Sequence, residues 1–306
     1  MKKVIYRDIR DIDVAEVVDS DPAEGEVTVR IKYCGICGSD LHEYLHGPFP
    51  MSTFGHEACG TITAIGSQVT GYAIGDRVCT VFPGAFAEAI VCPVERLIKI
   101  PPEMSWQRAA VLEPLSGAAY AIKRGGIETT HTVFIAGAGT VGLMFLMGLK
   151  AMGVETIYMT DVQENRRKMA EKLGATLVWN PTDLKSPAKI KALTQGRGVD
   201  IAIEAVGIQE TLKDCLASVR YQGTVIVQGI FTERAQMHML GFVTRETTMI
   251  GTSSIDPALA LAWLNTGLIH PESIVTDIIP LADIASSGFE VLAEKNKPAI
   301  KILVEP

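Results

Sequence analysis

Hydrophobic and polar residues alternate in two different ways along this chain of 306 residues. From the start to about Pro102, short runs with a period of two are separated by Gly and Pro turns, and Glu26–Tyr33 (EVTVRIKY) is the clearest of them. Such alternation is typical of half-buried strands, and regular short strands with little helix indicate a small barrel or sandwich. Further strands are predicted at Gly60–Gly66, Arg77–Val81, Ala85–Val91 and Leu97–Ile100.

Beyond Glu113, apolar strands alternate with helical segments. The strand Thr132–Ala136 leads into a helix at Thr140–Met152 that is rich in Leu and Met. Six strands joined mostly by helices indicate a doubly wound parallel sheet, so we predict an α/β fold of the Rossmann type with a second, β-rich domain. The other five strands are predicted at Thr156–Thr160, Thr176–Trp179, Val199–Ala205, Gly223–Gln228 and Thr248–Gly251.

The end of the chain has the same strand-like pattern of apolar and polar residues as its beginning. A helix in PALALAWLNTG is followed by IVTDIIPL and the strand-like AIKILVEP. The length also favours two domains. Residues 1–116 with 256–306 are predicted to form the β-rich domain, and residues 117–255 the nucleotide-binding domain.

Composition narrows the partners and the compartment. The net charge of -7 at pH 7 argues against nucleic acid or an anionic membrane as a partner. The N-terminal segment is charged throughout, so no signal peptide is predicted, and the longest apolar runs are too short to span a bilayer. Six unevenly spaced cysteines suit a reducing compartment, and we expect a cytoplasmic protein.

A glycine pattern follows the strand 132–136. Residues Gly137–Gly142 read GAGTVG, a G-x-G-x-x-G that opens the predicted helix, which is the context for binding a pyrophosphate. Asp161 ends the next strand, where a carboxylate accepts hydrogen bonds from ribose hydroxyls and repels a 2′-phosphate. NAD is therefore favoured over NADP, with Arg166 expected along the adenine. The alternative role for Asp161 is the N-cap of the helix that follows it.

The stretch CGICGSDLH, Cys34–His42, places two of the six cysteines three positions apart. A redox pair beside a βαβ unit fits poorly, because these cysteines follow an alternating strand in the β-rich half. A four-cysteine zinc site needs a second such pair, which the other cysteines do not supply. The remaining option is a catalytic metal with Cys, His and carboxylate ligands, and FGHE (Phe54–Glu57) and LEPL (Leu112–Leu115) contain candidates.

Spacing alone leaves this metal site undecided. His56 and Glu57 are adjacent and reach one ion only where the chain turns, which Gly55 permits. Glu113 precedes a proline and is expected at the mouth of the next helix. Each residue also has an ordinary interpretation: a hydrogen-bonded histidine, an acid beside a helix N-terminus and, at Cys34, a small buried hydrophobe.

Together these segments resemble the zinc-dependent medium-chain alcohol dehydrogenases. CGICGSDLHEYLHGP, FGHE, GDRV, AFAEAIV, LEPLSGAAYAIKRGGI, GAGTVG and EAVG occur in that family's order, and the likeness covers nearly the whole chain. It is closest to the branch of (R,R)-2,3-butanediol and sorbitol dehydrogenases, with threonine dehydrogenase nearby. The resemblance implies a GroES-like β-rich domain and hydride transfer between NAD and a secondary alcohol such as a vicinal diol or polyol, or an acetoin-like ketone. It also implies a homo-oligomer, either a dimer or a tetramer.

The resemblance also implies roles for single residues. One catalytic zinc would be held by Cys37, His56 and Glu57, with Glu113 as a ligand or a water-linked neighbour. Ser39 would bond the substrate oxygen, and His42 would pass its proton outward through the nicotinamide ribose. The expected cofactor contacts are Gly137, Gly139, Thr140, Val141, Gly142, Asp161, Arg166, Val206, Gly207 and Ile230.

Two departures from the family pattern bear on these expectations. Members with a structural zinc carry a four-cysteine lobe between GDRV and GFAE, whereas here only CTVFPGA separates the two segments, so no structural zinc is expected. The loop FPMST before GHE is also short. A larger substrate, such as a sugar or threonine, is therefore an alternative, and a non-catalytic NAD-binding sensor is another. Side chains suggested for an apolar pocket wall are Tyr44, Phe49, Phe82 and Ile230.

Overall fold

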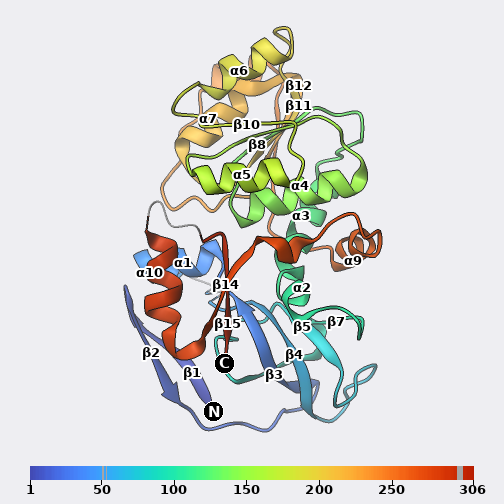
Figure 1. Cartoon of the computed structure of the whole chain (residues 1–306), viewed down its shortest axis with the longest axis vertical. Coiled ribbons are helices and arrows are strands. Elements are labelled where there is room, and N and C mark those ends of the chain that lie inside the picture. Colours follow the sequence, from blue (N-terminus) through green and yellow to red (C-terminus); the bar gives the residue numbers. More distant parts are fainter. Residues whose placement is uncertain (50–51, 53, 295–298) are drawn as a thin grey trace. The chain divides into compact units, whose positions relative to one another are not determined.

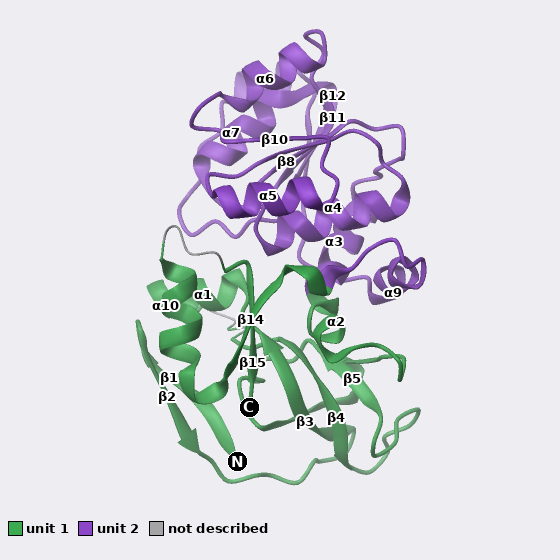
Figure 2. Ribbon diagram, in the orientation of Figure 1, with its two compact units in different colours: residues 1–113, 272–306 green, residues 114–271 purple. Residues whose placement is uncertain are grey.

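The chain divides into two compact units in a computed structural model that describes residues 1–49, 52, 54–294 and 299–306. Unit 1 comprises Met1–Glu113 and Glu272–Pro306, and unit 2 comprises Pro114–Pro271 (Figure 2). Part of the short loop FPMST, at residues 50, 51 and 53, lies outside the described residues. None of the helices within the described ranges is long and apolar enough to cross a bilayer.

The tail returns to unit 1 at Glu272, later than the predicted residue 256. The reason lies in the helix Pro257–Asn265, which packs against the helix Thr140–Met152 of unit 2. Asp256, its N-cap, also forms an ion pair with Lys123 at 2.9 Å. These contacts hold the helix in unit 2.

Unit 1 is built on a seven-stranded sheet and carries a separate two-stranded hairpin. Its strands and α-helices are β1 (Lys2–Asp8), β2 (Asp11–Glu16), β3 (Glu26–Gly35), α1 (Gly38–His46), β4 (Glu57–Ile65), β5 (Arg77–Thr80), β6 (Ala89–Pro93), β7 (Leu97–Lys99), α2 (Trp106–Ala110), β14 (Val275–Pro280), α10 (Glu290–Ala293) and β15 (Lys301–Glu305) (Figure 1). The sheet order is β14-β15-β3-β4-β5-β7, with β6 paired to β3. The C-terminal strand β15 therefore lies inside the sheet, parallel to β14 and antiparallel to β3.

Strand β3 shows why the period-two pattern succeeds. Val27, Val29 and Ile31 are buried, whereas Arg30 between them is exposed. Helix α1, in contrast, was not predicted. It begins with a capping box in which the Asp40 side chain accepts the N–H of Cys37 at 2.8 Å.

The core of unit 1 contains a cluster of aromatic rings. Tyr44 is 2% exposed and stacks on Phe289 with ring centroids 4.7 Å apart. Phe54 and Phe86 pack against the same Phe289 ring. Tyr44 is therefore a core residue of α1, which corrects its suggested place in a pocket wall. Short 3-10 turns occur at Val94–Arg96, Pro271–Ile274 and Leu281–Asp283, and a π-helical turn at Ile284–Phe289.

Unit 2 is a doubly wound parallel sheet, as predicted. Its elements after the start of α3 (Leu112–Arg124) are β8 (Val133–Ala136), α4 (Thr140–Met152), β9 (Ile157–Thr160), α5 (Glu164–Lys172), β10 (Leu177–Trp179), α6 (Ser186–Leu193), β11 (Val199–Glu204), α7 (Gln209–Ser218), β12 (Val219–Val227), α8 (Met239–Thr244), β13 (Thr248–Gly251) and α9 (Pro257–Asn265). The order β10-β9-β8-β11-β12-β13 corresponds to strands 3-2-1-4-5-6 of the unit, and all of its pairings are parallel. Strands β8, β9 and β11 are buried along their whole length, as expected of strands covered on both faces.

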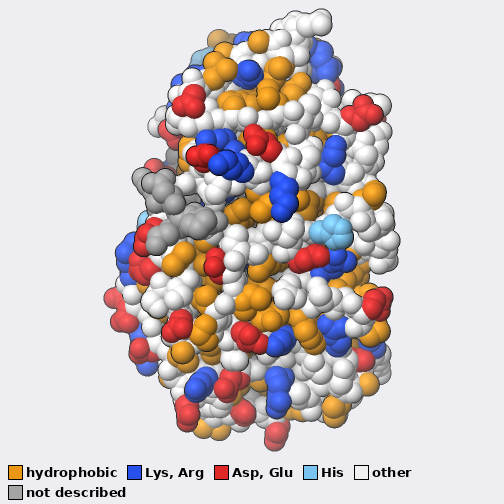
Figure 3. Space-filling view, viewed as in Figure 1, with side chains coloured by type: hydrophobic (Ala, Val, Ile, Leu, Met, Phe, Trp, Pro, Cys, Tyr) orange, Lys and Arg blue, Asp and Glu red, His pale blue; other side chains and the backbone are white. Residues whose placement is uncertain are grey.

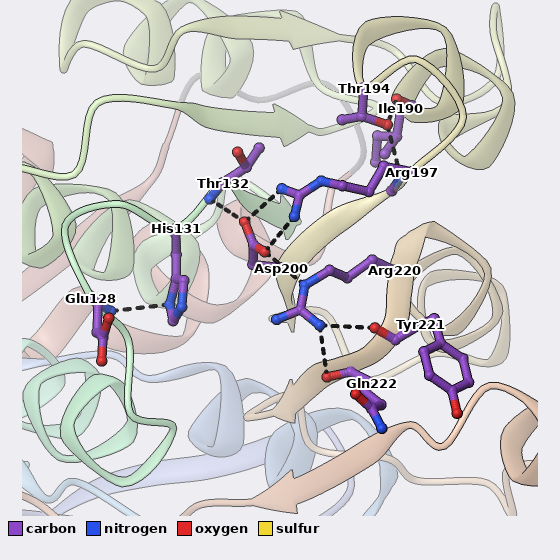
Figure 4. A network of polar contacts seen from close by, with 11 residues as sticks. Glu128, His131, Thr132, Ile190, Thr194, Arg197, Asp200, Arg220, Tyr221 and Gln222 are labelled. Carbon is purple, nitrogen blue, oxygen red and sulfur yellow. Dashed lines mark hydrogen bonds and ion pairs between the residues drawn. The ribbon is translucent and has the colours of Figure 1, made fainter.

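The amino end of β11 carries an ion-pair network around the buried carboxylate of Asp200, shown in Figure 4. The Asp200 carboxylate accepts two hydrogen bonds from the guanidinium of Arg197, each 3.0 Å long, and one of 2.7 Å from Arg220. The N–H of Thr132, just before β8, donates a further bond of 2.9 Å. This network joins β11 to the start of β8 and to β12. On the surface shown in Figure 3, by contrast, acidic and basic side chains are interspersed.

Candidate functional site

Three of the four predicted metal ligands meet in unit 1. Cys37, His56 and Glu57 each offer a ligand atom, and these atoms lie within 4.8 Å of one another. Sheet pairing produces this meeting, because Gly35 at the end of β3 lies opposite Glu57 at the start of β4. Cys37 follows Gly35 by two residues as the N-cap of α1, and His56 stands just before β4.

Asp40 organises the two segments that carry these ligands. Its carboxylate is fully buried and accepts the N–H of Cys37 at 2.8 Å and that of Gly55 at 2.9 Å. The Nδ1 atom of His56 lies 3.8 Å from the same carboxylate. A carboxylate behind a histidine is the usual partner of a metal-ligating imidazole. Asp40 is not among the site residues predicted from the sequence, although its position three residues after Cys37 is a recognisable capping signal.

Lys301 is a second site residue that the sequence does not predict. Its side chain is fully buried, and its ammonium group donates to the Glu57 carboxylate and, at 2.9 Å, to the carbonyl oxygen of Ile36. Strand β15 places it there, next to β3. The Glu57 carboxylate therefore has one oxygen bonded to Lys301.

Glu113 lies near this cluster but is not one of its three members. It lies in the first turn of α3, at the mouth of the helix as expected, although its own backbone is already helical because the helix begins at Leu112. Pro114 is tolerated there, since the first turn of a helix leaves its N–H groups without partners. Desolvation raises the pKa of Glu113 to about 7, with His56 opposing this rise and Glu57 adding to it.

The ionisable groups of this site change one another's pKa values. Burial and the Glu57 carboxylate raise the pKa of the Cys37 thiol. Burial alone would lower the pKa of His56, but hydrogen bonds to Asp40 and Cys37 raise it well above its usual value. Four groups that carry negative charge when ionised face two cationic side chains in this part of the described chain. They are Cys37, Asp40, Glu57 and Glu113, opposite His56 and Lys301. The Cys/His/carboxylate donor set fits a zinc ion.

Ser39 and His42 lie on helix α1, three residues apart, so their side chains share one face of the helix. Ser39 is 5% exposed, whereas His42 is half-buried and stacks with His46 and Phe49 at 4.7 and 4.8 Å between ring centroids. Burial and the neighbouring His46 lower the pKa of His42. A neutral imidazole near pH 7 accepts a proton readily.

The glycine loop in unit 2 has the expected geometry for a dinucleotide. Its first residue follows β8, and Gly139 is the N-cap of α4. A Cβ on Gly142 would overlap the carbonyl oxygen of Gly137, so the helix can pack this closely on the loop only with glycine there. A Cβ on Gly139 would meet nothing closer than the Arg166 guanidinium at 3.7 Å. Space for a pyrophosphate is therefore left at the helix N-terminus.

Asp161 lies directly after β9 and bonds to this loop. Its Oδ2 atom accepts the N–H of Ala138 at 2.9 Å, and its Oδ1 atom accepts that of Gln163 at 2.8 Å. The N-cap of α5 is Gln163, so the alternative role of Asp161 as that N-cap is wrong. Arg166 lies 4.0 Å from the Asp161 carboxylate.

The remaining predicted cofactor contacts come together at the carboxyl ends of β11 and β12. A Cβ on Gly137 would lie 2.6 Å from Val206, and one on Gly207 would overlap the backbone of Ile230. Val206 and Ile230 are 44% and 47% exposed, which is unusual for large apolar side chains beside a buried sheet. They offer an apolar surface next to the glycine loop.

Comparisons with known proteins identify the family of both units. An alcohol dehydrogenase GroES-like domain model matches residues 23–102, and a zinc-binding dehydrogenase model matches residues 140–263. The (R,R)-butanediol dehydrogenase of Bacillus subtilis is 31% identical over 348 residues, covering 100% of both chains. The sorbitol dehydrogenase of the same organism is 29% identical, covering 100% of this chain and 97% of the relative.

The chain belongs to the zinc-dependent medium-chain alcohol dehydrogenase family. A crystal structure of the 2R,3R-butanediol dehydrogenase from Bacillus subtilis matches with a TM-score of 0.91 at 29% identity, covering 100% of this chain and 99% of the other. A putative zinc-binding dehydrogenase from Sinorhizobium meliloti, solved with NADP bound, matches with a TM-score of 0.86 at 26% identity over 100% and 99% of the two chains. The predicted family, the GroES-like and Rossmann fold and the assignment as an enzyme are therefore confirmed. Membership also associates this dehydrogenase with zinc and a nicotinamide cofactor.

Proposed function

We propose that this dehydrogenase transfers a hydride between NAD and a secondary alcohol, preferably a vicinal diol or polyol, or the corresponding acetoin-like ketone. The observation that carries the proposal is the convergence of ligand atoms of Cys37, His56 and Glu57 within 4.8 Å of one another. The named activities of its relatives, on butanediol and on sorbitol, favour adjacent hydroxyl groups in the substrate.

One zinc ion per chain would be held by Cys37 and His56, with Glu57 as a third ligand. Asp40 would keep the His56 ring oriented and the thiolate segment fixed through the N–H of Cys37. Lys301 would balance the charge of Glu57, and Glu113 would lie beside the ion directly or through water. When bound, zinc supplies Lewis-acid chemistry and the nicotinamide supplies the hydride acceptor.

Ser39 and His42 would carry the substrate's proton away from the site. The buried Ser39 hydroxyl would bond the substrate oxygen, and His42, one helical turn further and partly exposed, would receive the proton. The lowered pKa of His42 supports this role, because a neutral ring accepts a proton at pH 7.

NAD is proposed as the cofactor on the strength of Asp161. Its carboxylate follows β9 at the position that meets the adenosine ribose, and it already bonds the glycine loop. The predicted contacts are Gly137, Gly139, Thr140, Val141, Gly142, Asp161, Arg166, Val206, Gly207 and Ile230.

The experiment that tests the proposal is a substrate screen with metal analysis of the same sample. Butanediol stereoisomers, acetoin, sorbitol and threonine would be assayed with NAD and with NADP, and zinc would be measured per chain. Turnover of diols with NAD and one zinc per chain is expected. Equal turnover of threonine would favour the threonine-type alternative, which the short loops keep open. Bound NADH without metal or turnover would favour a sensor.

We also propose that the protein is a cytoplasmic homo-oligomer. All six cysteines are free, and five of them are buried, as suits a reducing compartment. Strand β13 is an edge strand of unit 2, and the neighbouring α8 exposes Met239, Leu240 and Val243 by more than half of their surface. Exposed apolar side chains beside an open strand edge suit pairing with a second copy. Analytical ultracentrifugation with Val243→Lys tests this, since a dimer through this surface would dissociate.

A further inference from the structure

Glu204 is a buried acid that none of the roles above uses. It is the last residue of β11 and has no exposed surface. Its neighbours across the sheet are Ala136, which ends β8, and Val227, which ends β12. It therefore stands at the edge of the sheet where the glycine loop begins.

A single carboxylate oxygen of Glu204 fixes the segment that follows β11. Its Oε1 atom accepts the N–H of Val206 at 3.0 Å, the N–H of Gly207 at 2.9 Å and the hydroxyl of Thr211 at 2.6 Å. Thr211 belongs to the first turn of α7. The side chain thus ties the turn 205–208 to the helix that leaves it.

The backbone of the same residue fixes the segment that follows β12. The carbonyl oxygen of Glu204 accepts the N–H of Gln228 at 2.9 Å and that of Gly229 at 3.1 Å. The two segments then touch, because Gly207, with φ of +90°, lies against the backbone of Ile230. Both segments carry residues that we assign to the cofactor, and the segment after β11 adjoins the glycine loop through Val206.

The second oxygen of Glu204 is left over. Oε2 is buried next to Gly229 and has no hydrogen-bond partner among the described residues. A buried polar atom without a partner costs stability. All three hydrogen bonds to the turn use the same acceptor atom, Oε1. A side chain that keeps this one oxygen should therefore be enough to hold the turn.

We propose that Glu204 is a positioning residue for the nicotinamide cofactor. It shapes the turn at Val206 and Gly207 before the cofactor arrives, so that binding does not have to order this segment. Rigidifying a binding segment in its bound form raises affinity by removing the cost of ordering it. This inference rests on the proposed use of NAD.

The test is a fluorescence titration of the full-length protein with NADH in the absence of substrate. Glu204→Leu fills the same space without an acceptor and is expected to raise the NADH dissociation constant at least about tenfold, since three hydrogen bonds to the turn are lost. Thr211→Val removes one of the three bonds and is expected to raise it about threefold. Glu204→Gln keeps one acceptor oxygen and should stay close to wild type.

Asp200→Asn is the matched control. Asp200 is also a buried acid of β11, but it lies at the opposite end of the strand, in the ion-pair network of Figure 4. This variant is expected to lower the unfolding temperature and leave the NADH dissociation constant unchanged. All titrations are made at a temperature where circular dichroism shows every variant folded. Zinc content should be the same throughout, because no substitution touches the metal cluster.

The outcomes separate the two proposals. Failure of the wild type to bind NADH overturns the proposed function and this inference together. If the wild type binds, then NADH affinity in Glu204→Leu equal to wild type overturns the inference alone, as does equal weakening in Asp200→Asn. Should Glu204→Leu not fold, unchanged affinity in Thr211→Val overturns it instead. A rise in the KM for NAD that exceeds the fall in kcat is the expected kinetic counterpart.

Discussion

The two units build their sites from different materials. The proposed metal centre of unit 1 is made of side chains, and one of them, Glu57, is paired with Lys301, which is 244 residues away in the chain. The proposed cofactor site of unit 2 is made mostly of backbone. Its glycine segments lie at the ends of parallel strands and, having no side chains, leave room for a ligand. A site made of side chains loses one ligand with each substitution. A site made of backbone is impaired when a new side chain occupies its space, or when a residue that holds the backbone in position is replaced. Substitutions in the metal site of unit 1 should therefore leave cofactor binding intact, and substitutions in the cofactor site of unit 2 should leave metal binding intact.

The largest effect is expected for Cys37→Ser. Loss of this thiolate should remove zinc and reduce turnover by at least about a thousandfold, since a metal Lewis acid contributes several kcal/mol to catalysis. NADH binding should persist, because the glycine loop belongs to unit 2. Metal analysis and NADH titration of the same preparation check both halves.

Cys34→Ala is the control for this change. Cys34 is three positions away and fully buried in β3, where burial raises the pKa of its thiol well above the usual value. The variant should keep zinc and turnover and lose about 1 kcal/mol of stability. Loss of zinc from this variant, or its retention by Cys37→Ser, would contradict the assigned ligand.

His42→Ala is expected to lower kcat about a hundredfold, the usual contribution of a general acid–base group. Zinc content should not change, because His42 is not among the proposed metal ligands. The control is His46→Ala, one turn further along α1, which should have a small effect. Stopped-flow measurement of hydride transfer tests the relay, and equal losses in the two variants would argue for simple packing.

Asp161→Gly should weaken NAD binding about tenfold, because two hydrogen bonds to the ribose and one to Ala138 are lost. NADP use should improve, since Arg166 stands 4.0 Å from the lost carboxylate and could meet a 2′-phosphate. The ratio of kcat/KM for the two cofactors is the measurement. Glu164→Gln, an exposed acid in the first turn of α5, is the control and should leave the ratio unchanged.

Asp200→Asn is expected to lower the stability of unit 2 without affecting either binding site. Burial would raise the pKa of Asp200, but Arg197, the N–H of Thr132 and Arg220 lower it to about 2. Since the unfolded value is about 4, the carboxylate stabilises unit 2 by about 2 kcal/mol above that pH, and this contribution disappears as the pH falls toward 2. Denaturant unfolding of both proteins at pH 7 and pH 3 should show a difference that shrinks in acid. A constant difference would mean that the ion pairs do not supply it.

Much of unit 2 could be predicted from the sequence. The helix Thr140–Met152 and the strand Thr248–Gly251 have the predicted bounds, because a Rossmann unit is assembled from neighbours in the chain whose local patterns decide their structure. The glycine loop and Asp161 follow from the same regularity.

Unit 1 was harder to predict, and the misses share a cause. The strand predicted at Ala85–Val91 begins only at Ala89, because the N–H of Ala85 bonds the carbonyl of Gly55 beside the metal cluster. Helix α1 was not predicted because its segment contains the Cys and His residues of a candidate metal site, which drew the interpretation towards ligands. The role of Asp40 in that helix was missed for the same reason. Lys301 carries no signal in its own neighbourhood, because its partner is defined only when β15 enters the sheet next to β3.

The place of β15 also has a consequence for assembly during synthesis. Unit 2 is one uninterrupted segment, whereas the sheet of unit 1 needs strands from both sides of it. On the ribosome, unit 2 can therefore fold while β3 and β4 still await the strand that carries Lys301. The nascent protein should acquire its nucleotide pocket before its metal pocket, and the thiol of residue 37 must stay reduced through that interval.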